Sequence, residues 1–83
     1  MKEGLINRLN QIKYLAQKQK SKKAFWQVIP MGLIGEKFSV KESDLSLDDL
    51  KHYSVMMIDL MCVEIGKISF LADRQIELNE EED

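Results

Sequence analysis

The sequence predicts an all-α protein: a helical hairpin that pairs with a second copy to form a helical bundle. Apolar residues recur at helical spacing in both halves of the 83-residue chain, and the single proline, Pro30, lies between them. The charge also divides between the halves. Residues 1–40 carry eight basic and two acidic residues, and residues 41–83 carry four basic and twelve acidic residues, within a net charge of −2. This division favours a basic helix that lies beside an acidic one, in the same chain or in a second copy.

The first element is a basic amphipathic helix over about residues 3–22. Leu5, Leu9, Ile12 and Ala16 follow at spacings of four, three and four, which places them on one helix face. Lysines surround this face. The apolar stripe stops where Lys23 occupies an apolar position, so we expect the helix to end near residues 20–23.

An apolar linker follows over residues 24–35, in which Gln27 is the one polar residue. Pro30 lacks a backbone donor, and Gly32 and Gly35 permit turns. Because surface loops are usually polar, this linker must pack against its own helices or against a partner.

Two segments then have the pattern of a capping box, the serine and acidic residue that close the start of a helix. They are Ser39 with Glu42 and Ser46 with Asp49. We expect a short turn over residues 39–45 and a long helix over about residues 46–78.

The long helix is apolar on nearly all sides, with a narrow polar strip that carries Asp48, His52, Asp59 and Glu77. A helix of this kind is buried on nearly all sides, and one short partner helix does not suffice to cover it. Self-association is therefore expected, with Met57, Met61, Ile65 and Ile68 near the interface. The main apolar face consists of Leu47, Leu50, Met57, Ile58, Met61, Ile65, Ile68 and Ala72.

An alternative for this region is an α+β fold with a hairpin at about residues 61–72. Two apolar runs flank Gly66 and Lys67, as two strands flank a two-residue turn. The continuous helix is preferred because the apolar face continues across Gly66, and a lone glycine costs a helix only about 1 kcal/mol relative to alanine. The chain then forms a single small helical domain over residues 1–78, followed by a disordered acidic tail over residues 79–83.

The sequence carries no motif for catalysis or for a cofactor. The segment from Gly32 to Gly35 lacks the Lys-Ser/Thr pair of a phosphate-binding loop. His52 lies with Asp48 and Asp59 on the polar strip, where such residues simply face water, and Cys62 between Met61 and Val63 is typical of a small buried hydrophobe. We therefore expect no enzyme, no cofactor and no metal.

Size and composition favour a small cytoplasmic protein–protein interaction module: an adaptor, an inhibitor or a chaperone-like regulator. The N-terminus has no export signal, and charged residues interrupt the most apolar stretch before it could span a membrane. The expected partners are a second copy, which gives a homodimer, and an unidentified target protein. Aromatic and methionine side chains in the apolar linker are typical binding anchors, so the candidate partner-binding residues are Phe25, Trp26, Ile29, Met31, Leu33 and Ile34.

The alternative function is non-specific nucleic-acid binding. Lysines at the end of the first helix neutralise phosphates, and an adjacent aromatic ring stacks on a base. The net negative charge and the presence of only two arginines, Arg8 and Arg74, count against sequence-specific readout. The candidate nucleic-acid-binding residues are Lys13, Lys18, Lys20, Lys22 and Lys23.

Overall fold

The computed structural model is all-α, as the sequence predicts, and its described residues include no strand. The structure describes the backbone of residues 2–81 and the side chains of residues 3–68 and 74. Its elements are α1 Lys2–Gln17, α2 Lys22–Val28, α3 Leu33–Phe38, the 3₁₀ turn η1 Glu42–Asp44, and α4 Leu47–Glu81. Since α4 runs unbroken through residues 61–72, the alternative with a β-hairpin is not supported.

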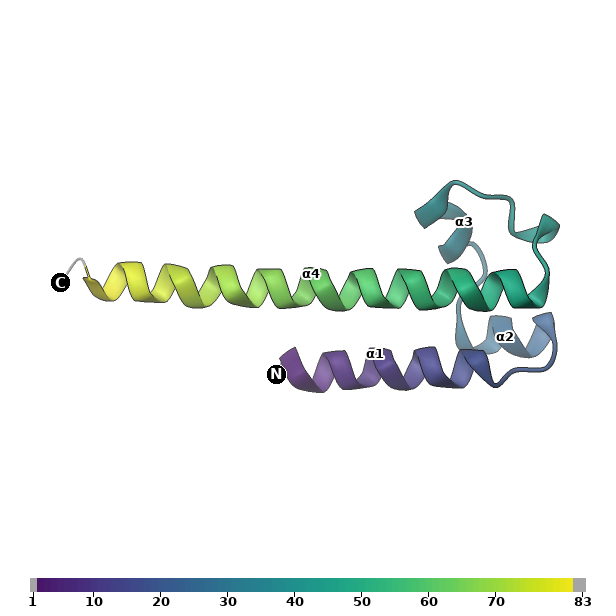
Figure 1. Ribbon diagram of the computed structural model, residues 1–83, viewed down its shortest axis with the longest axis horizontal. Coiled ribbons are helices and arrows are strands. Elements are labelled where there is room, and N and C mark those ends of the chain that lie inside the picture. The colour runs from purple at the N-terminus through teal and green to yellow at the C-terminus, as the bar shows by residue number, and fades with distance from the viewer. Residues whose placement is uncertain (1, 82–83) are drawn as a thin grey trace.

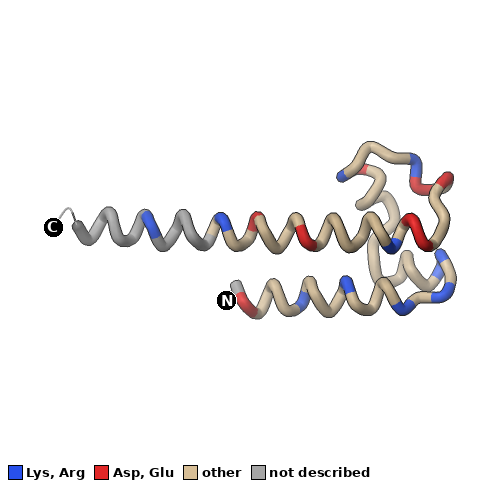
Figure 2. The backbone as a smooth tube through the Cα atoms, viewed as in Figure 1, with Lys and Arg blue, Asp and Glu red and all other residues tan. Residues whose placement is uncertain are grey.

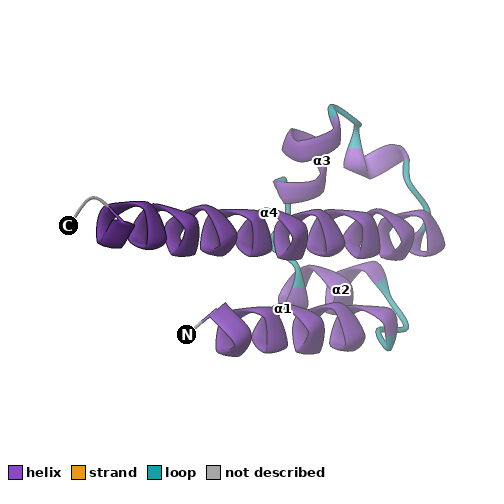
Figure 3. Cartoon of the chain, turned by 60° about the vertical axis from the view of Figure 1, so that its left-hand side comes forward, coloured by secondary structure: helices purple, strands orange, loops and turns teal. Residues whose placement is uncertain are grey.

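The helices form an elongated molecule of 57 × 24 × 15 Å built along α4. Figure 1 shows α1 antiparallel beside α4, and α4 continues past the N-terminal end of α1. The helix α2 packs against α1, while α3 lies against another side of α4, as the rotated view in Figure 3 also shows. The hairpin of a shorter and a longer helix is therefore present, with two short helices inside the connection.

The first helix ends earlier than the sequence predicts, at Gln17 instead of near residues 20–23. The backbone N–H of Lys18 bonds to the carbonyl of Leu15 at 3.2 Å, which tightens the last turn. Ser21 then begins α2, because its hydroxyl accepts a hydrogen bond of 3.1 Å from the amide of Ala24. The apolar linker is thus largely helical.

The expected helix start at Ser39 is wrong, although the expected turn over residues 39–45 is present as η1. Ser39 ends α3 with a left-handed backbone, φ 55°. The carboxylate of Glu42 turns away from Ser39 and accepts hydrogen bonds from the amides of Gly32 at 2.7 Å and Gly35 at 2.9 Å. Glu42 therefore caps the start of α3 from outside that helix.

The second capping box is confirmed at the start of α4. The hydroxyl of Ser46 accepts a hydrogen bond of 3.1 Å from the amide of Asp49, and the carboxylate of Asp49 accepts one of 3.3 Å from the amide of Ser46. Two backbone donors at the helix N-terminus are thereby satisfied reciprocally.

The core lies where all four helices meet. Its side chains keep 3% or less of their surface exposed and are Ala16, Phe25, Ile29, Ile34, Leu50, Met57 and Ile58. Ile68, which the sequence places on the same apolar face of α4, is 67% exposed, and Ala72 lies outside the described side chains. Met57 is buried within the chain, so it is not available for the homodimer interface that the sequence suggested.

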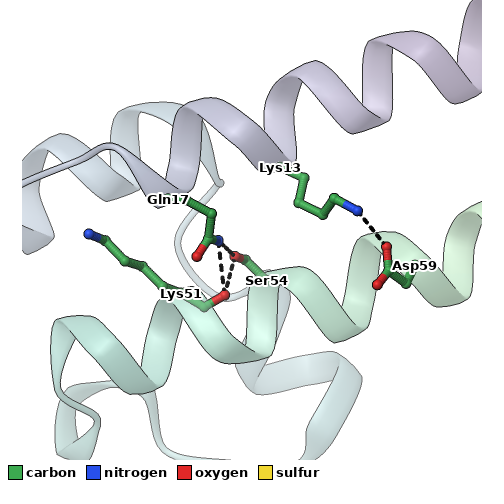
Figure 4. A network of polar contacts seen from close by, with 5 residues as sticks. All are labelled: Lys13, Gln17, Lys51, Ser54 and Asp59. Atoms are coloured by element: carbon green, nitrogen blue, oxygen red, sulfur yellow. Dashed lines mark hydrogen bonds and ion pairs between the residues drawn. The ribbon is translucent and has the colours of Figure 1, made fainter.

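A polar network fixes α1 on α4 (Figure 4). Ser54 of α4 is fully buried, and its hydroxyl donates to the carbonyl of Lys51 at 2.6 Å. Gln17 of α1 donates to the same carbonyl at 3.1 Å and to the Ser54 hydroxyl at 3.0 Å. About one turn away, Lys13 and Asp59 form an ion pair of 2.7 Å, so Asp59 does not merely face water. The long helix runs to Glu81, beyond the end expected near residue 78, and residues 82–83 of the expected acidic tail lie outside the described residues.

Candidate functional site

A pocket of about 380 Å³ lies at the end of the molecule where α2, the turn into α3 and η1 meet. Lys22 and Trp26 come from α2, and Met31 comes from the turn that follows it. We call this hollow the Trp26–Met31 pocket. Its lining residues are Lys22, Trp26, Met31, Glu42 and Ser43.

The walls of this pocket are held by the core and by backbone hydrogen bonds. Trp26 packs edge-on against the fully buried Phe25, with ring centroids 5.2 Å apart and an interplanar angle of 77°. Glu42 joins η1 to the start of α3 through its bonds to Gly32 and Gly35. The indole of Trp26 and the side chain of Glu42 are therefore both positioned before any ligand arrives.

The six predicted partner-binding residues divide between core and surface. Phe25, Ile29 and Ile34 are buried, so they hold the fold and do not reach a partner. Trp26 is half-buried at the pocket and Met31 is 71% exposed beside it. Leu33 is 40% exposed and lines a separate hollow of about 370 Å³ with Glu36 and Lys37.

The five candidate nucleic-acid-binding lysines are also divided. Lys13 pairs with Asp59, and the ammonium of Lys18 lies 4.2 Å from the centre of the Tyr14 ring. Lys20, Lys22 and Lys23 are exposed at the α1–α2 corner, where Figure 2 shows basic residues gathered. Within the described part of the chain, these three lysines form no ion pair.

A second apolar surface was not predicted as a site. Met56, Leu60 and Val63 lie at spacings of four and three along one face of α4 and are 40%, 45% and 53% exposed. With Asp59 they line a hollow of about 350 Å³. We call this surface the α4 open face. Its helical spacing was visible in the sequence, but only the positions of α1 and α3 determine which side of α4 stays uncovered.

The polar strip of α4 carries Asp48, His52 and Asp59 within the described side chains. Among the described residues, no three side chains of His, Cys, Asp or Glu come close enough together to hold a metal ion. Cys62 is a free, half-buried thiol packed against the core. The part of the chain that the structure describes also lacks a helix with the length and apolar character needed to cross a bilayer.

Comparison of this chain with protein-family models, with curated proteins and with solved structures found no match. The two apolar surfaces and the lysine corner are therefore the features that bear on function.

Proposed function

We propose that the chain is a small protein–protein interaction module that acts without catalysis and binds a target protein at the Trp26–Met31 pocket. The observation that carries this proposal is the 71% exposure of Met31 beside the indole of Trp26, at the mouth of a preformed pocket. A methionine and a tryptophan in this position supply the large apolar contact area that dominates protein interfaces.

Preorganisation supports the same proposal. Trp26 is braced by the buried Phe25, and Glu42 is held by its hydrogen bonds to the start of α3. Binding to such a pocket orders few additional side chains, so little conformational entropy is lost on association. An adaptor, an inhibitor or a chaperone-like regulator would each use a surface of this kind.

We also propose that the module acts as a homodimer. Its support is the α4 open face, because the helices that the structure describes leave three apolar side chains at helical spacing exposed. A second copy would bury them.

Non-specific nucleic-acid binding is the second candidate, and it is favoured by Lys20, Lys22 and Lys23 at the α1–α2 corner, which form no ion pair with any described residue. Trp26 lies close to them in sequence and on α2 with Lys22 and Lys23. The net charge of −2 and the pairing of Lys13 with Asp59 weaken this candidate.

The test is affinity capture from the native lysate with matched variants. Met31→Asp is expected to abolish capture of a specific protein, because it replaces an apolar contact with a carboxylate that would lose its hydration on binding. Glu36→Gln is the control, since Glu36 is exposed, lies outside this pocket and loses only its charge. Unchanged capture by Met31→Asp would contradict the proposal, as would capture that nuclease treatment removes.

A further inference from the structure

We propose that two copies of this chain pair antiparallel through the α4 open face, with Val63 of each copy at the two-fold axis. This inference rests on the homodimer proposed above, which uses the same face, and adds the orientation and the register of the two helices. The surface consists of Met56, Leu60 and Val63, which α1 and α3 leave exposed.

A second α4 suits this surface because the exposed residues form a seam. Spacings of four and three residues are those with which one helix packs side chains between those of another. The position of the seam favours the α4 of a second copy as the partner, since α4 has its midpoint at Glu64, one residue from Val63. Antiparallel pairing about Val63 therefore overlaps the two helices along almost their whole length.

The charges beside the seam decide the orientation. Asp59 lies four residues before Val63 and Lys67 four residues after it, and both are exposed. In the antiparallel pair, each Lys67 lies at the same level along the helices as the partner's Asp59. In a parallel pair, like charges would lie at the same level, which is unfavourable. The pairing of Asp59 with Lys13 leaves carboxylate lone pairs for a second cation.

The division of charge in the sequence favours the same orientation. Residues 73–81 at the C-terminal end of α4 contain four acidic residues and Arg74, whereas Lys20, Lys22 and Lys23 lie at the α1–α2 corner, near the opposite end of α4. An antiparallel copy brings the acidic end of one chain toward the lysines of the other.

Disulfide trapping in full-length variants tests the register. In a Cys62→Ala background, Val63→Cys is expected to form a covalent dimer on mild oxidation, because the two thiols face each other at the axis. Lys67→Cys is the matched control. In the antiparallel pair its two copies lie about 12 Å apart along the axis, at 1.5 Å per residue, and do not cross-link. We expect Val63→Cys to cross-link at least about tenfold faster than Lys67→Cys.

A charge in the seam supplies the independent measurement. Leu60→Glu is expected to convert the dimer to a monomer in sedimentation equilibrium while the helical circular dichroism persists, because Leu60 is exposed in the single chain.

Equal cross-linking of both cysteine variants, or a wild-type monomer throughout the micromolar range, would overturn the inference. If that monomer still captured a target that Met31→Asp loses, the proposed target binding would stand alone. If the dimer were trapped at Val63 but no such target were captured, the dimer would stand and the proposed target binding would fail.

Discussion

Gln17 of α1 donates a hydrogen bond of 3.0 Å to the hydroxyl of Ser54 on α4, and Ser54 has no exposed surface. The Ser54 hydroxyl in turn donates to the carbonyl of Lys51, which also accepts a bond from Gln17. This closed network satisfies the buried polar atoms and fixes the register of the two helices, since a shift of α1 by one residue would break both bonds from Gln17.

Loss of this network has a measurable cost. Ser54→Ala and Gln17→Ala are each expected to lower the free energy of unfolding by about 1–3 kcal/mol, because each removes two neutral hydrogen bonds at a partly buried interface. The double variant should lose less than the sum of the two by about 0.5–1 kcal/mol, since the residues share a bond. Urea unfolding gives these values. Gln11→Ala, on the exposed side of α1, is the control and should change little. Strict additivity would show that the network does not form.

Two adjacent methionines test which face of α4 packs against the core. Met57 is 3% exposed and Met56 is 40% exposed. Met57→Ala is expected to cost about 2–5 kcal/mol, because it leaves a cavity in the core, whereas Met56→Ala should cost less than about 1 kcal/mol. Both variants should be made in the Leu60→Glu background, so that dimer formation does not contribute to the measured free energy of unfolding. The opposite order would mean that α4 presents a different face to α1 and α3.

Glu42 is expected to stabilise the start of α3 and the wall of the Trp26–Met31 pocket. Glu42→Ala removes two charge-assisted hydrogen bonds and should cost about 1.5–3 kcal/mol. Amide hydrogen exchange at Gly32 and Gly35 should accelerate in the same variant. Asp44→Ala, in the same turn and exposed, serves as the control. Equal stability of the two variants would be evidence against the cap.

Two glycines should respond to alanine with opposite signs. A Cβ at Gly35 would lie 2.9 Å from the carbonyl oxygen of Val40, so Gly35→Ala is expected to destabilise the chain by about 1–3 kcal/mol. A Cβ at Gly66 meets nothing within 4 Å, and the residue is helical, so Gly66→Ala should stabilise by up to about 1 kcal/mol. Thermal unfolding separates these outcomes. A destabilising Gly66→Ala would revive the turn at Gly66 that the structure replaces with continuous helix.

Local patterns in the sequence predicted local structure well. The capping box at Ser46 was predicted from the serine and the acid three residues later, because both bonds form within one turn of helix. Ser39 and Glu42 have the same spacing, yet the chain placed the free amides of Gly32 and Gly35 within reach of Glu42. Glu42 could accept hydrogen bonds either from Ser39 or from Gly32 and Gly35. The tertiary fold decides between them, and no local sequence pattern encodes that choice.

The candidate site was predicted only in outline for the same reason. Composition identified the apolar linker but gave no basis for separating buried Phe25 and Ile34 from exposed Met31, since all three are apolar. The break in the helical stripe at Lys23 was recognised, whereas the restart of a helix at Ser21 was not. The buried Ser54 was also missed, because a serine between apolar residues carries no sign of its partner Gln17.

The dependence of target affinity on salt tests the central claim, protein recognition through an apolar surface, most directly. The measurement is the dissociation constant of the captured target at several salt concentrations, for the wild-type chain and for Lys20→Ala/Lys23→Ala. We expect a nearly flat dependence that the lysine substitutions barely change, because apolar contacts at Trp26 and Met31 supply the affinity. A steep decline in affinity, with a log–log slope near −0.7 to −0.9 for each phosphate neutralised and reduced by the lysine substitutions, would contradict the account and identify a nucleic-acid binder.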